Sequence, residues 1–351
     1  MEEIPFVLPG PPERRSGGTL YSLRLVRELG AGGLPVRLVW LSDRFPFPRP
    51  EDARAAERVF AELPAGAPVV VDGLVLGALP ELAARYRDRL RLVVLHHHPI
   101  SLEPGLPPEI ARSLFAAERT ALACARQVIV TSSTTRDLLI REFRVPFARL
   151  AVAPPGTDPA APAHGSQWNP PQLLSVGALV PRKDHLGLVR ALAQLADRPF
   201  RLDIVGSTTV DPATTRTVVE AIASFGLGDR VRLLGEQMGE ALEACYARAD
   251  LFVSASRFEG YGMALAEALA RGLPIVAVRA GAVPEVVPET AGILVEPGHP
   301  GALAAAIARL LRDPALQARL RAGALAARQR LAGWQETAHT VRRLLTLAAR
   351  A

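Results

Sequence analysis

The chain has 351 residues, more than one ordinary hydrophobic core accommodates, so we expect two domains. Its net charge is +6, but the arginines are scattered over many expected helices and no long run of like charges occurs, which disfavours nucleic-acid binding. Cys124 and Cys245 lack metal-ligand spacing, and neither a signal peptide nor a membrane-spanning apolar stretch is evident, so we expect a cytoplasmic protein with buried thiols. The basic surface leaves open a peripheral contact with an anionic membrane face.

Apolar strands alternate with helices along the first half of the sequence. We expect strands over residues 4–8, 35–41, 68–72, 91–96, 127–131 and 149–154, and helices over residues 20–29 and 107–124. Gly17 and Gly18 separate the first strand from the first helix, where two glycines let the backbone approach a ligand; a flexible turn explains them equally well. Arg14 and Arg15 before them form either a solvated pair or an attraction for an anionic acceptor.

Three histidines, His96 to His98, end the expected strand 91–96. Neighbouring residues on a strand point to opposite faces, so only His96 and His98 could share a metal ion. No nearby carboxylate or cysteine completes such a site, and we therefore expect no metal. Structural histidines with satisfied hydrogen bonds stay an alternative. We expect Glu118, on helix 107–124, to be an acid of the helix surface or of a domain boundary.

A linker of Pro, Gly, Ala and polar residues over 154–172 leads into a second alternating half. There we expect strands over residues 172–177, 200–206, 230–235, 250–255, 274–278 and 292–296, and helices over residues 183–196, 213–225, 262–271 and 300–312. A last helix, about 333–350, could pack on either half. Continuous apolar strands alternating with helices indicate an α/β protein with parallel sheets covered on both faces, and two such sheets that face each other would enclose a ligand cleft.

The stretch "SRFEGYGMALAEALARG" carries the clearest chemical pattern. Gly260 and Gly262 allow a tight turn, and a helix beginning near Met263 presents free N–H groups that suit a diphosphate. Glu259 and Glu267 stand on either side of this turn, and carboxylates accept hydrogen bonds from hydroxyls. Each glutamate alone reads as a solvated acid. The two together favour a polyhydroxylated ligand that contains a diphosphate.

Glu259, Glu267 and the intervening "EGYG" resemble the E-x7-E signature of family 4 retaining glycosyltransferases, which have the GT-B fold. "LLSVGALVPRKDHLGLVRALAQL" is similar to the donor-phosphate segment of that family, and "RLDIVG" to its next strand. The resemblance is strong over about 170–312 and looser over 1–160. It implies two facing Rossmann-like, doubly wound parallel-sheet domains with an interdomain cleft. Residues 1–160 would bind the acceptor, with helix 333–351 as a candidate addition, and residues 170–332 the donor.

The resemblance also implies roles for individual residues of the second half. Glu259 would meet the hydroxyls of the donor sugar and Glu267 the nucleotide ribose. Lys183 is the single lysine of the chain, and with Arg182 it would face the donor diphosphate. The sequence departs from the commoner family pattern at Ala178, where an arginine is usual, and at Asp184, where a glycine is usual.

Further donor contacts follow from the same resemblance. They fall on Gly177 at a strand end, on Met238 in the wall around the base, and on Gly260, Tyr261, Gly262 and Met263. Gly206 would admit the nucleotide closely, although a plain strand-end turn is almost as good an explanation. From the first half, Gly17 and Gly18 would lie against the diphosphate, and His96 or His97 would contact the transferred sugar, with His98 beside them.

These residues predict a retaining, hexosyl-type glycosyltransferase that uses a UDP-, GDP- or ADP-linked sugar and an unidentified saccharide, lipid-linked or small-molecule acceptor. No D-x-D occurs, so we expect no metal and no other cofactor. A non-catalytic nucleotide-sugar-binding protein and a nucleotide-sugar epimerase of the same fold stay open. The sequence has no G-x-G-x-x-G after either first strand and no GK[ST], which disfavours a dehydrogenase and a P-loop kinase.

Overall fold

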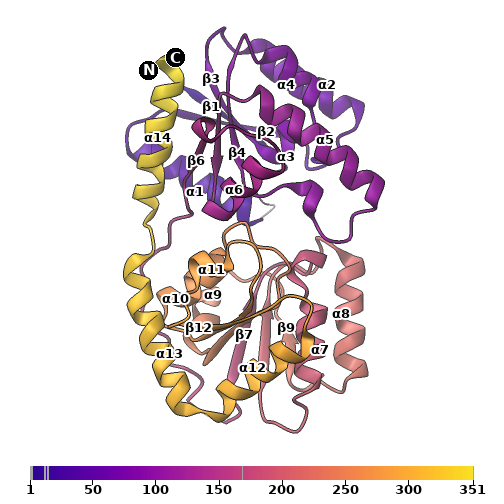
Figure 1. The fold of residues 1–351 in the computed structure, drawn as a ribbon, viewed down its shortest axis with the longest axis vertical. Helices are drawn as coiled ribbons and strands as arrows, with labels where there is room; N and C mark the ends of the chain where they lie inside the picture. Colours follow the sequence, from indigo (N-terminus) through magenta and orange to yellow (C-terminus); the bar gives the residue numbers. More distant parts are fainter. Residues whose placement is uncertain (1–2, 12, 14–15, 168, 351) are drawn as a thin grey trace. The chain divides into compact units, whose positions relative to one another are not determined.

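The computed structural model describes residues 3–350 except positions 12, 14, 15 and 168, so Arg14 and Arg15 lie outside the described residues (Figure 1). The chain forms two compact units. Unit 1 comprises Met1–Gly156 and Ala332–Ala351, and unit 2 comprises Thr157–Leu331. No helix in the described part of the chain is both long and apolar enough to cross a bilayer.

In its described residues, unit 1 has a six-stranded parallel sheet in the order β2-β1-β3-β4-β5-β6. The strands are β1 (Ile4–Pro9), β2 (Val36–Leu41), β3 (Pro68–Asp72), β4 (Arg91–His96), β5 (Gln127–Val130) and β6 (Leu150–Val152). The helices are α1 (Gly17–Ala31), α2 (Pro50–Glu62), α3 (Gly73–Gly77), α4 (Pro80–Tyr86), η1 (Ile100–Leu102), α5 (Pro108–Cys124), α6 (Ser133–Arg141), η2 (Phe147–Arg149) and α14 (Trp334–Arg350). Val70 and Val93 of the central strands are fully buried, as expected for a sheet covered on both faces.

Helix α14 returns to unit 1 and lies beside α1 (Figure 1). The apolar stripe of α14 is buried, as shown by Val341 and Leu345. Thr337 Oγ1 donates a hydrogen bond of 2.7 Å to the carbonyl of Pro154, just after β6. The buried Trp334 ring packs 5.7 Å from that of Tyr21 on α1. The amphipathic sequence left the choice of partner open, and these contacts decide it.

The described residues of unit 2 also contain a six-stranded parallel sheet, in the order β12-β11-β10-β7-β8-β9. The strands are β7 (Gln172–Val176), β8 (Arg201–Val205), β9 (Val231–Leu233), β10 (Leu251–Ser254), β11 (Ile275–Val278) and β12 (Gly292–Val295). The helices are η3 (Pro181–Lys183), α7 (His185–Ala193), α8 (Pro212–Ser224), α9 (Gly239–Ala247), α10 (Met263–Ala270), α11 (Val283–Val286), α12 (Pro300–Arg312), α13 (Pro314–Ala327) and η4 (Arg328–Arg330).

Each sheet has one point where the direction of strand addition reverses. In unit 1 this switch point lies between β1 and β3, and in unit 2 between β7 and β10. Loops leaving two neighbouring strands at a switch point run to opposite faces of the sheet, which opens a crevice at the carboxyl ends of the strands. The loop after β7 carries Lys183, and the loop after β10 carries Glu259. Topology alone therefore brings the two side chains toward one edge of the sheet.

Candidate active site

Lys183 and Glu259 form a close ion pair at the switch point of unit 2. Lys183 Nζ lies 2.6 Å from Glu259 Oε1, and an Arg182 guanidinium nitrogen lies 3.5 Å from Glu259 Oε2. The Glu259 side chain is only 8% exposed, whereas both cations retain partial exposure. The arrangement is a buried carboxylate with two basic groups between it and solvent, so an incoming anion would meet positive charge first.

Burial by itself would raise the pKa of Glu259. The charges of Lys183 and Arg182, with hydrogen bonds from Lys183 and Ser256, outweigh burial and lower this pKa to about 2. Glu259 is therefore ionised at neutral pH, when it can only accept hydrogen bonds. A ligand hydroxyl that replaced the ammonium would meet a full carboxylate.

The two loops of the pair are joined along their backbones. The Arg257 N–H donates to the carbonyl of Arg182 at 2.8 Å, and Arg182 donates through its guanidinium to the carbonyl of Phe258 at 3.1 Å. Arg257 Nε also donates to Asp184 Oδ2 at 3.0 Å. Hydrogen bonds donated from each loop to the other hold the segments next to Lys183 and Glu259. The geometry of the ion pair is therefore fixed within unit 2.

Asp184 explains both a departure from the family pattern and a shifted helix start. Its φ of 47° is left-handed, a conformation that glycine adopts freely and that aspartate tolerates better than most residues. Its carboxylate caps α7 by accepting from the Gly187 N–H at 3.1 Å. Helix α7 therefore begins at His185 rather than at Lys183, which lies in the preceding 3-10 turn.

Gly206 makes its close approach to the protein's own backbone. A Cβ built on Gly206, whose φ is 152°, would lie 2.0 Å from the carbonyl oxygen of Gly177. A Cβ on Gly177 would in turn lie 3.1 Å from Lys183 Cδ. The contact that requires a glycine at position 206 is therefore the packing of two strand ends, and the aliphatic part of Lys183 crosses Gly177.

The second glutamate, Glu267, lies on α10, whose N-cap is Gly262 and whose first residue is Met263. Glu267 Oε2 accepts a hydrogen bond of 2.7 Å from the Tyr246 hydroxyl. Burial raises the pKa of Glu267, while this hydrogen bond opposes the rise. Glu267 is half-buried, whereas the sequence alone suggested a solvated acid.

The remaining donor candidates of unit 2 differ in exposure. Gly260 and Tyr261 are half-buried in the turn before α10, and burial raises the pKa of Tyr261 to about 12. Met238 is 46% exposed at the N-cap of α9, with an apolar side chain available to a flat ligand.

In unit 1, Gly17 and Gly18 are the first residues of α1 rather than a turn before it, and Gly18 lies against the histidines at the end of β4. A Cβ on Gly18 would lie 2.8 Å from His97 Cδ2, so the imidazole packs on the glycine backbone; Gly17 leaves the space around its Cα open. The His97 ring meets Tyr21 edge-on at 5.3 Å. His97 Nε2 lies 3.5 Å from Asp72 Oδ2 at the end of β3. These contacts fix the ring of His97 beside the first helix.

His96 and His98 have different surroundings. His96 is 2% exposed, and its Nε2 has no hydrogen-bond partner among the described residues. Burial, together with the neighbouring histidines, lowers the pKa of His96 to about 3, so this imidazole is neutral. His98 Nε2 contacts Glu103 Oε1 at 2.6 Å. His97 and His98 are both partly exposed and each lies near a carboxylate, but of the two it is His97 that also packs on the Gly18 backbone and on Tyr21.

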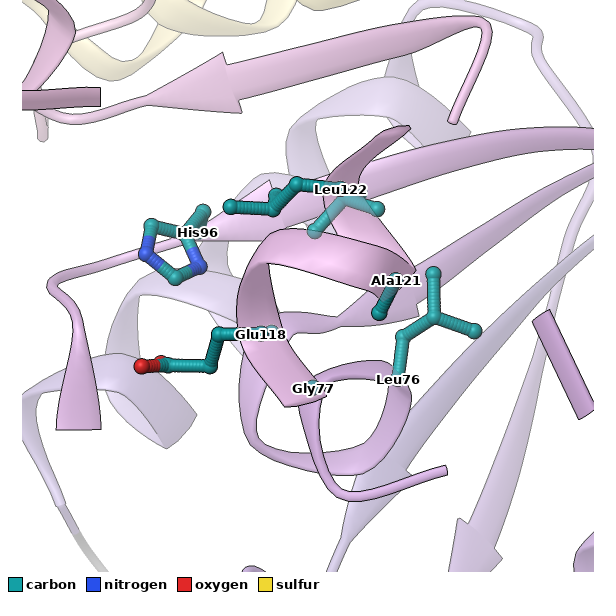
Figure 2. A pocket seen from close by; sticks show the side chains of 8 residues that line it. Leu76, Gly77, His96, Glu118, Ala121 and Leu122 are labelled. Carbon is teal, nitrogen blue, oxygen red and sulfur yellow. The ribbon is translucent and has the colours of Figure 1, made fainter. Parts of the chain in front are cut away.

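The expectation that Glu118 is a surface or boundary acid is wrong. Glu118 is 1% exposed and faces the same small pocket as His96, between α5 and the end of β4 (Figure 2). Its carboxylate accepts from the N–H groups of Ile100 and Ser101, at 2.8 and 3.1 Å, and from the Ser101 hydroxyl at 2.5 Å. Glu118 thus anchors the segment that follows the histidines. The apolar spacing around it on α5 gave no sign of this buried role.

The structure adds residues that sequence reasoning missed. Tyr246, Asp72 and Ser256 each contact a predicted site residue. None stands inside a recognisable spacing, so only the folded contacts identify them. Within the described residues, no group of three or more His, Cys, Asp or Glu side chains is placed to hold a metal ion. Both cysteines are free; Cys245 is buried and Cys124 only half-buried.

Two family models match this chain. Residues 158–326 match "Glycosyl transferases group 1", and residues 35–161 match "Glycosyltransferase Family 4". Together the matches extend over both units.

Curated relatives are about 30% identical to the chain over the segments that align. The D-inositol 3-phosphate glycosyltransferase of Xylanimonas cellulosilytica is 31% identical over 255 residues, which are 68% of this chain and 60% of that protein. The MMP alpha-(1->4)-mannosyltransferase of Mycolicibacterium hassiacum is 30% identical over 332 residues, 89% of this chain and 75% of that protein. The chain therefore spans between about three-fifths and three-quarters of these relatives' length.

Solved structures share the fold over nearly the whole chain. Sucrose-phosphate synthase from Thermosynechococcus elongatus superposes with a TM-score of 0.83 at 24% identity, covering 99% of this chain and all of that one. HepE from Anabaena, solved in complex with UDP-glucose, gives 0.76 at 19% identity, covering 98% of this chain and 99% of that one. By sequence and by fold, the chain belongs to the family 4 glycosyltransferases and has two Rossmann-like domains of the GT-B type.

Proposed function

We propose that this protein transfers a hexosyl group from a nucleoside-diphosphate sugar to an acceptor hydroxyl, with retention at the anomeric carbon and without a metal ion. The observation that carries the proposal is the ion pair of Lys183 and Glu259 at the switch point of unit 2. It combines a cation for a leaving diphosphate with a carboxylate for sugar hydroxyls. A glycosyl donor needs the cation and the carboxylate within a few ångströms of the bond between its sugar and its diphosphate.

Lys183 and Arg182 stabilise the charge that develops on the departing diphosphate. Arg182 is held by its hydrogen bond to the Phe258 carbonyl, so this cation is preorganised for the reaction. In the structure, Lys183 donates a hydrogen bond to Glu259. The diphosphate then takes over the ammonium, which turns the carboxylate oxygens toward the hydroxyls of the sugar. The backbone N–H groups at the start of α10, around Gly262 and Met263, supply further donors to the phosphates.

The other residues of unit 2 are assigned to the ribose, the phosphates and the base of the donor nucleotide. Glu267 accepts from the ribose, Gly177 and Gly260 line the phosphates beside Tyr261, and Met238 packs on the base. HepE, which shares the fold, was solved with UDP-glucose, so UDP is the first nucleotide to test.

Retention follows from attack on the face that the leaving group departs from. The bond between the anomeric carbon and the diphosphate oxygen breaks with its electron pair on the diphosphate. The acceptor oxygen bonds to the same face, and its proton passes to the leaving diphosphate oxygen. Glu259 acts as a hydrogen-bond acceptor in this step, and no proton transfer is assigned to it.

Unit 1 supplies the acceptor contacts and one contact to the transferred sugar. We assign the sugar contact to His97, whose ring is fixed by Gly18 and Tyr21. His96 is buried and neutral, so its role is to shape the end of β4. The acceptor is a hydroxyl compound whose class is open, because the relatives' named substrates differ from one another.

The test begins with thermal shift across UDP, GDP and ADP, because a ligand that binds the folded state raises its melting temperature. The sugar donors of the stabilising nucleotide are then assayed for transfer in the presence of EDTA, and the product anomer is assigned by NMR. We expect unchanged activity in EDTA and a product with the donor's anomeric configuration. A requirement for a divalent ion, or an inverted product, would refute the proposal. Binding without transfer or donor hydrolysis would instead favour a non-catalytic protein.

A further inference from the structure

Tyr246 on α9 is a buried tyrosine whose hydroxyl points at Glu267. The residue is 0% exposed. Its hydroxyl lies 2.7 Å from Glu267 Oε2 and 3.3 Å from the carbonyl oxygen of Ala264, on the turn of α10 that precedes Glu267. The shorter contact is to the carboxylate, which is the stronger acceptor of the two.

The ring of Tyr246 packs against a cation and a second aromatic ring. The Arg271 guanidinium carbon lies over the ring, 4.4 Å from its centroid. Phe252 of β10 stacks on the ring with centroids 6.2 Å apart and planes within 11°. Arg271 is itself fixed, because it donates to the Glu267 carbonyl at 2.8 Å and to the Glu243 carboxylate. The tyrosine therefore cannot turn its hydroxyl away without breaking several contacts.

The direction of the hydrogen bond is also determined. Burial raises the pKa of Tyr246 well above its ordinary value, and the nearby Glu267 carboxylate raises it further. The phenol thus keeps its proton and donates it. With Oε2 engaged, the plane of the Glu267 carboxyl is set, and no hydrogen bond to Oε1 is formed among the described residues, so its lone pairs can serve a ligand.

We propose that Tyr246 is a positioning residue that orients Glu267 to accept hydrogen bonds from the ribose hydroxyls of the donor nucleotide, and so sets the preference for ribose over deoxyribose. This inference rests on the proposed function, which places the nucleotide in unit 2. Tyr246 itself touches no ligand; it acts through Glu267. Without the hydrogen bond from Tyr246, the Glu267 carboxylate could rotate, and a ribose hydroxyl would lose a preformed acceptor.

The test compares nucleoside diphosphates with and without ribose hydroxyls on the full-length protein. UDP, GDP and ADP and their 2′,3′-dideoxy forms are titrated by calorimetry against the wild type and Tyr246→Phe. The phenylalanine keeps the ring against Arg271 and Phe252, and circular dichroism and melting temperature check the fold. We expect the wild type to prefer the ribose form, and Tyr246→Phe to weaken that form by about tenfold while the dideoxy form changes by less than about twofold.

A double-mutant cycle separates orientation from general packing. In a Glu267→Ala background, Tyr246→Phe should leave ribonucleotide affinity within about twofold, because the group it orients is gone. Equal weakening of ribose and dideoxy forms, or no weakening of either, overturns the inference and leaves the proposed function intact. Failure of the wild type to bind any nucleoside diphosphate refutes the proposed function and this inference with it.

Discussion

Both units gather polar side chains where their parallel strands end, but the two sets differ in charge. In unit 2, Lys183 and Glu259 are an ion pair, and their mutual attraction keeps the pKa of Glu259 at about 2. In unit 1, burial lowers the pKa of His96 to about 3 and raises that of Glu118, so each shift favours the neutral form. The shift in unit 2 favours a charged carboxylate, whereas the shifts of His96 and Glu118 in unit 1 favour their neutral forms.

This difference suits the two halves of a glycosyl transfer. A departing diphosphate carries charge that must be met by groups already charged, as in unit 2. An acceptor hydroxyl and a sugar are neutral, so side chains in fixed positions are sufficient, such as His97 in unit 1. The contrast can be tested by removing the charge of Lys183, by neutralising Glu259, and by measuring how His96 affects stability as the pH changes.

Removing the ammonium of Lys183 should produce the largest effect. Lys183→Ala should lower the transfer rate by about 10³-fold, because one preorganised group that stabilises developing charge is lost. Steady-state transfer with the preferred nucleotide sugar measures this. Lys183→Met is the matched variant, since it keeps the aliphatic stem that crosses Gly177. Equal losses in both variants assign the effect to charge, whereas near-normal turnover in either would remove the contrast between the units.

Glu259→Gln should separate catalysis from nucleotide affinity. We expect transfer to fall by about 10²-fold, since the sugar loses an ionised acceptor. The affinity for the sugar-free nucleoside diphosphate should instead rise, by about three- to tenfold, because Lys183 is no longer engaged by a carboxylate. Calorimetry with the bare diphosphate gives the affinity. A variant that binds the diphosphate more weakly would show that Glu259 assists the cation rather than competing with the ligand.

Most of this arrangement could be predicted where residue type and spacing were distinctive. The alternation of apolar runs and helices predicted the parallel strands of both sheets to within a few residues, because a buried parallel strand reads as a short apolar run. Lys183 stood out as the single lysine of the chain, and Glu259 as the first glutamate of the pair that Glu267 completes. The family resemblance implied that each would face the ligand, but not that the two side chains form an ion pair with one another.

Residues that act through tertiary contacts could not be predicted. Glu118 looked like a helix-surface acid, because its partners are backbone N–H groups of a separate segment that no pattern on α5 reveals. Tyr246 lies in an alanine-rich helix and matters only because α9 packs beside α10. The left-handed Asp184 could be noticed as a departure, yet its capping bond to Gly187 required coordinates.

The smallest expected effect is a pH dependence of stability that arises in unit 1. The pKa of His96 is about 3 in the folded protein and about 6.5 when unfolded, so the folded state binds fewer protons between these values. His96 therefore costs no stability above pH 6.5, and stability falls as the pH drops toward 3, by at most about 1.4 kcal/mol per pH unit for this one group. Glu259 contributes a separate stabilisation, which is present in full above about pH 4.3 and is lost as the pH falls through 2.

The two windows allow the histidine to be tested alone. His96→Leu should reduce the slope of the unfolding free energy between pH 6.5 and 5, measured by urea unfolding at each pH, because the group that titrates only on unfolding is gone. His339→Leu on the exposed face of α14 is the matched control, since it also removes one imidazole. An equal change in both variants, or none at His96, would mean that the end of β4 admits a proton, and the neutral character of unit 1 would have to be abandoned.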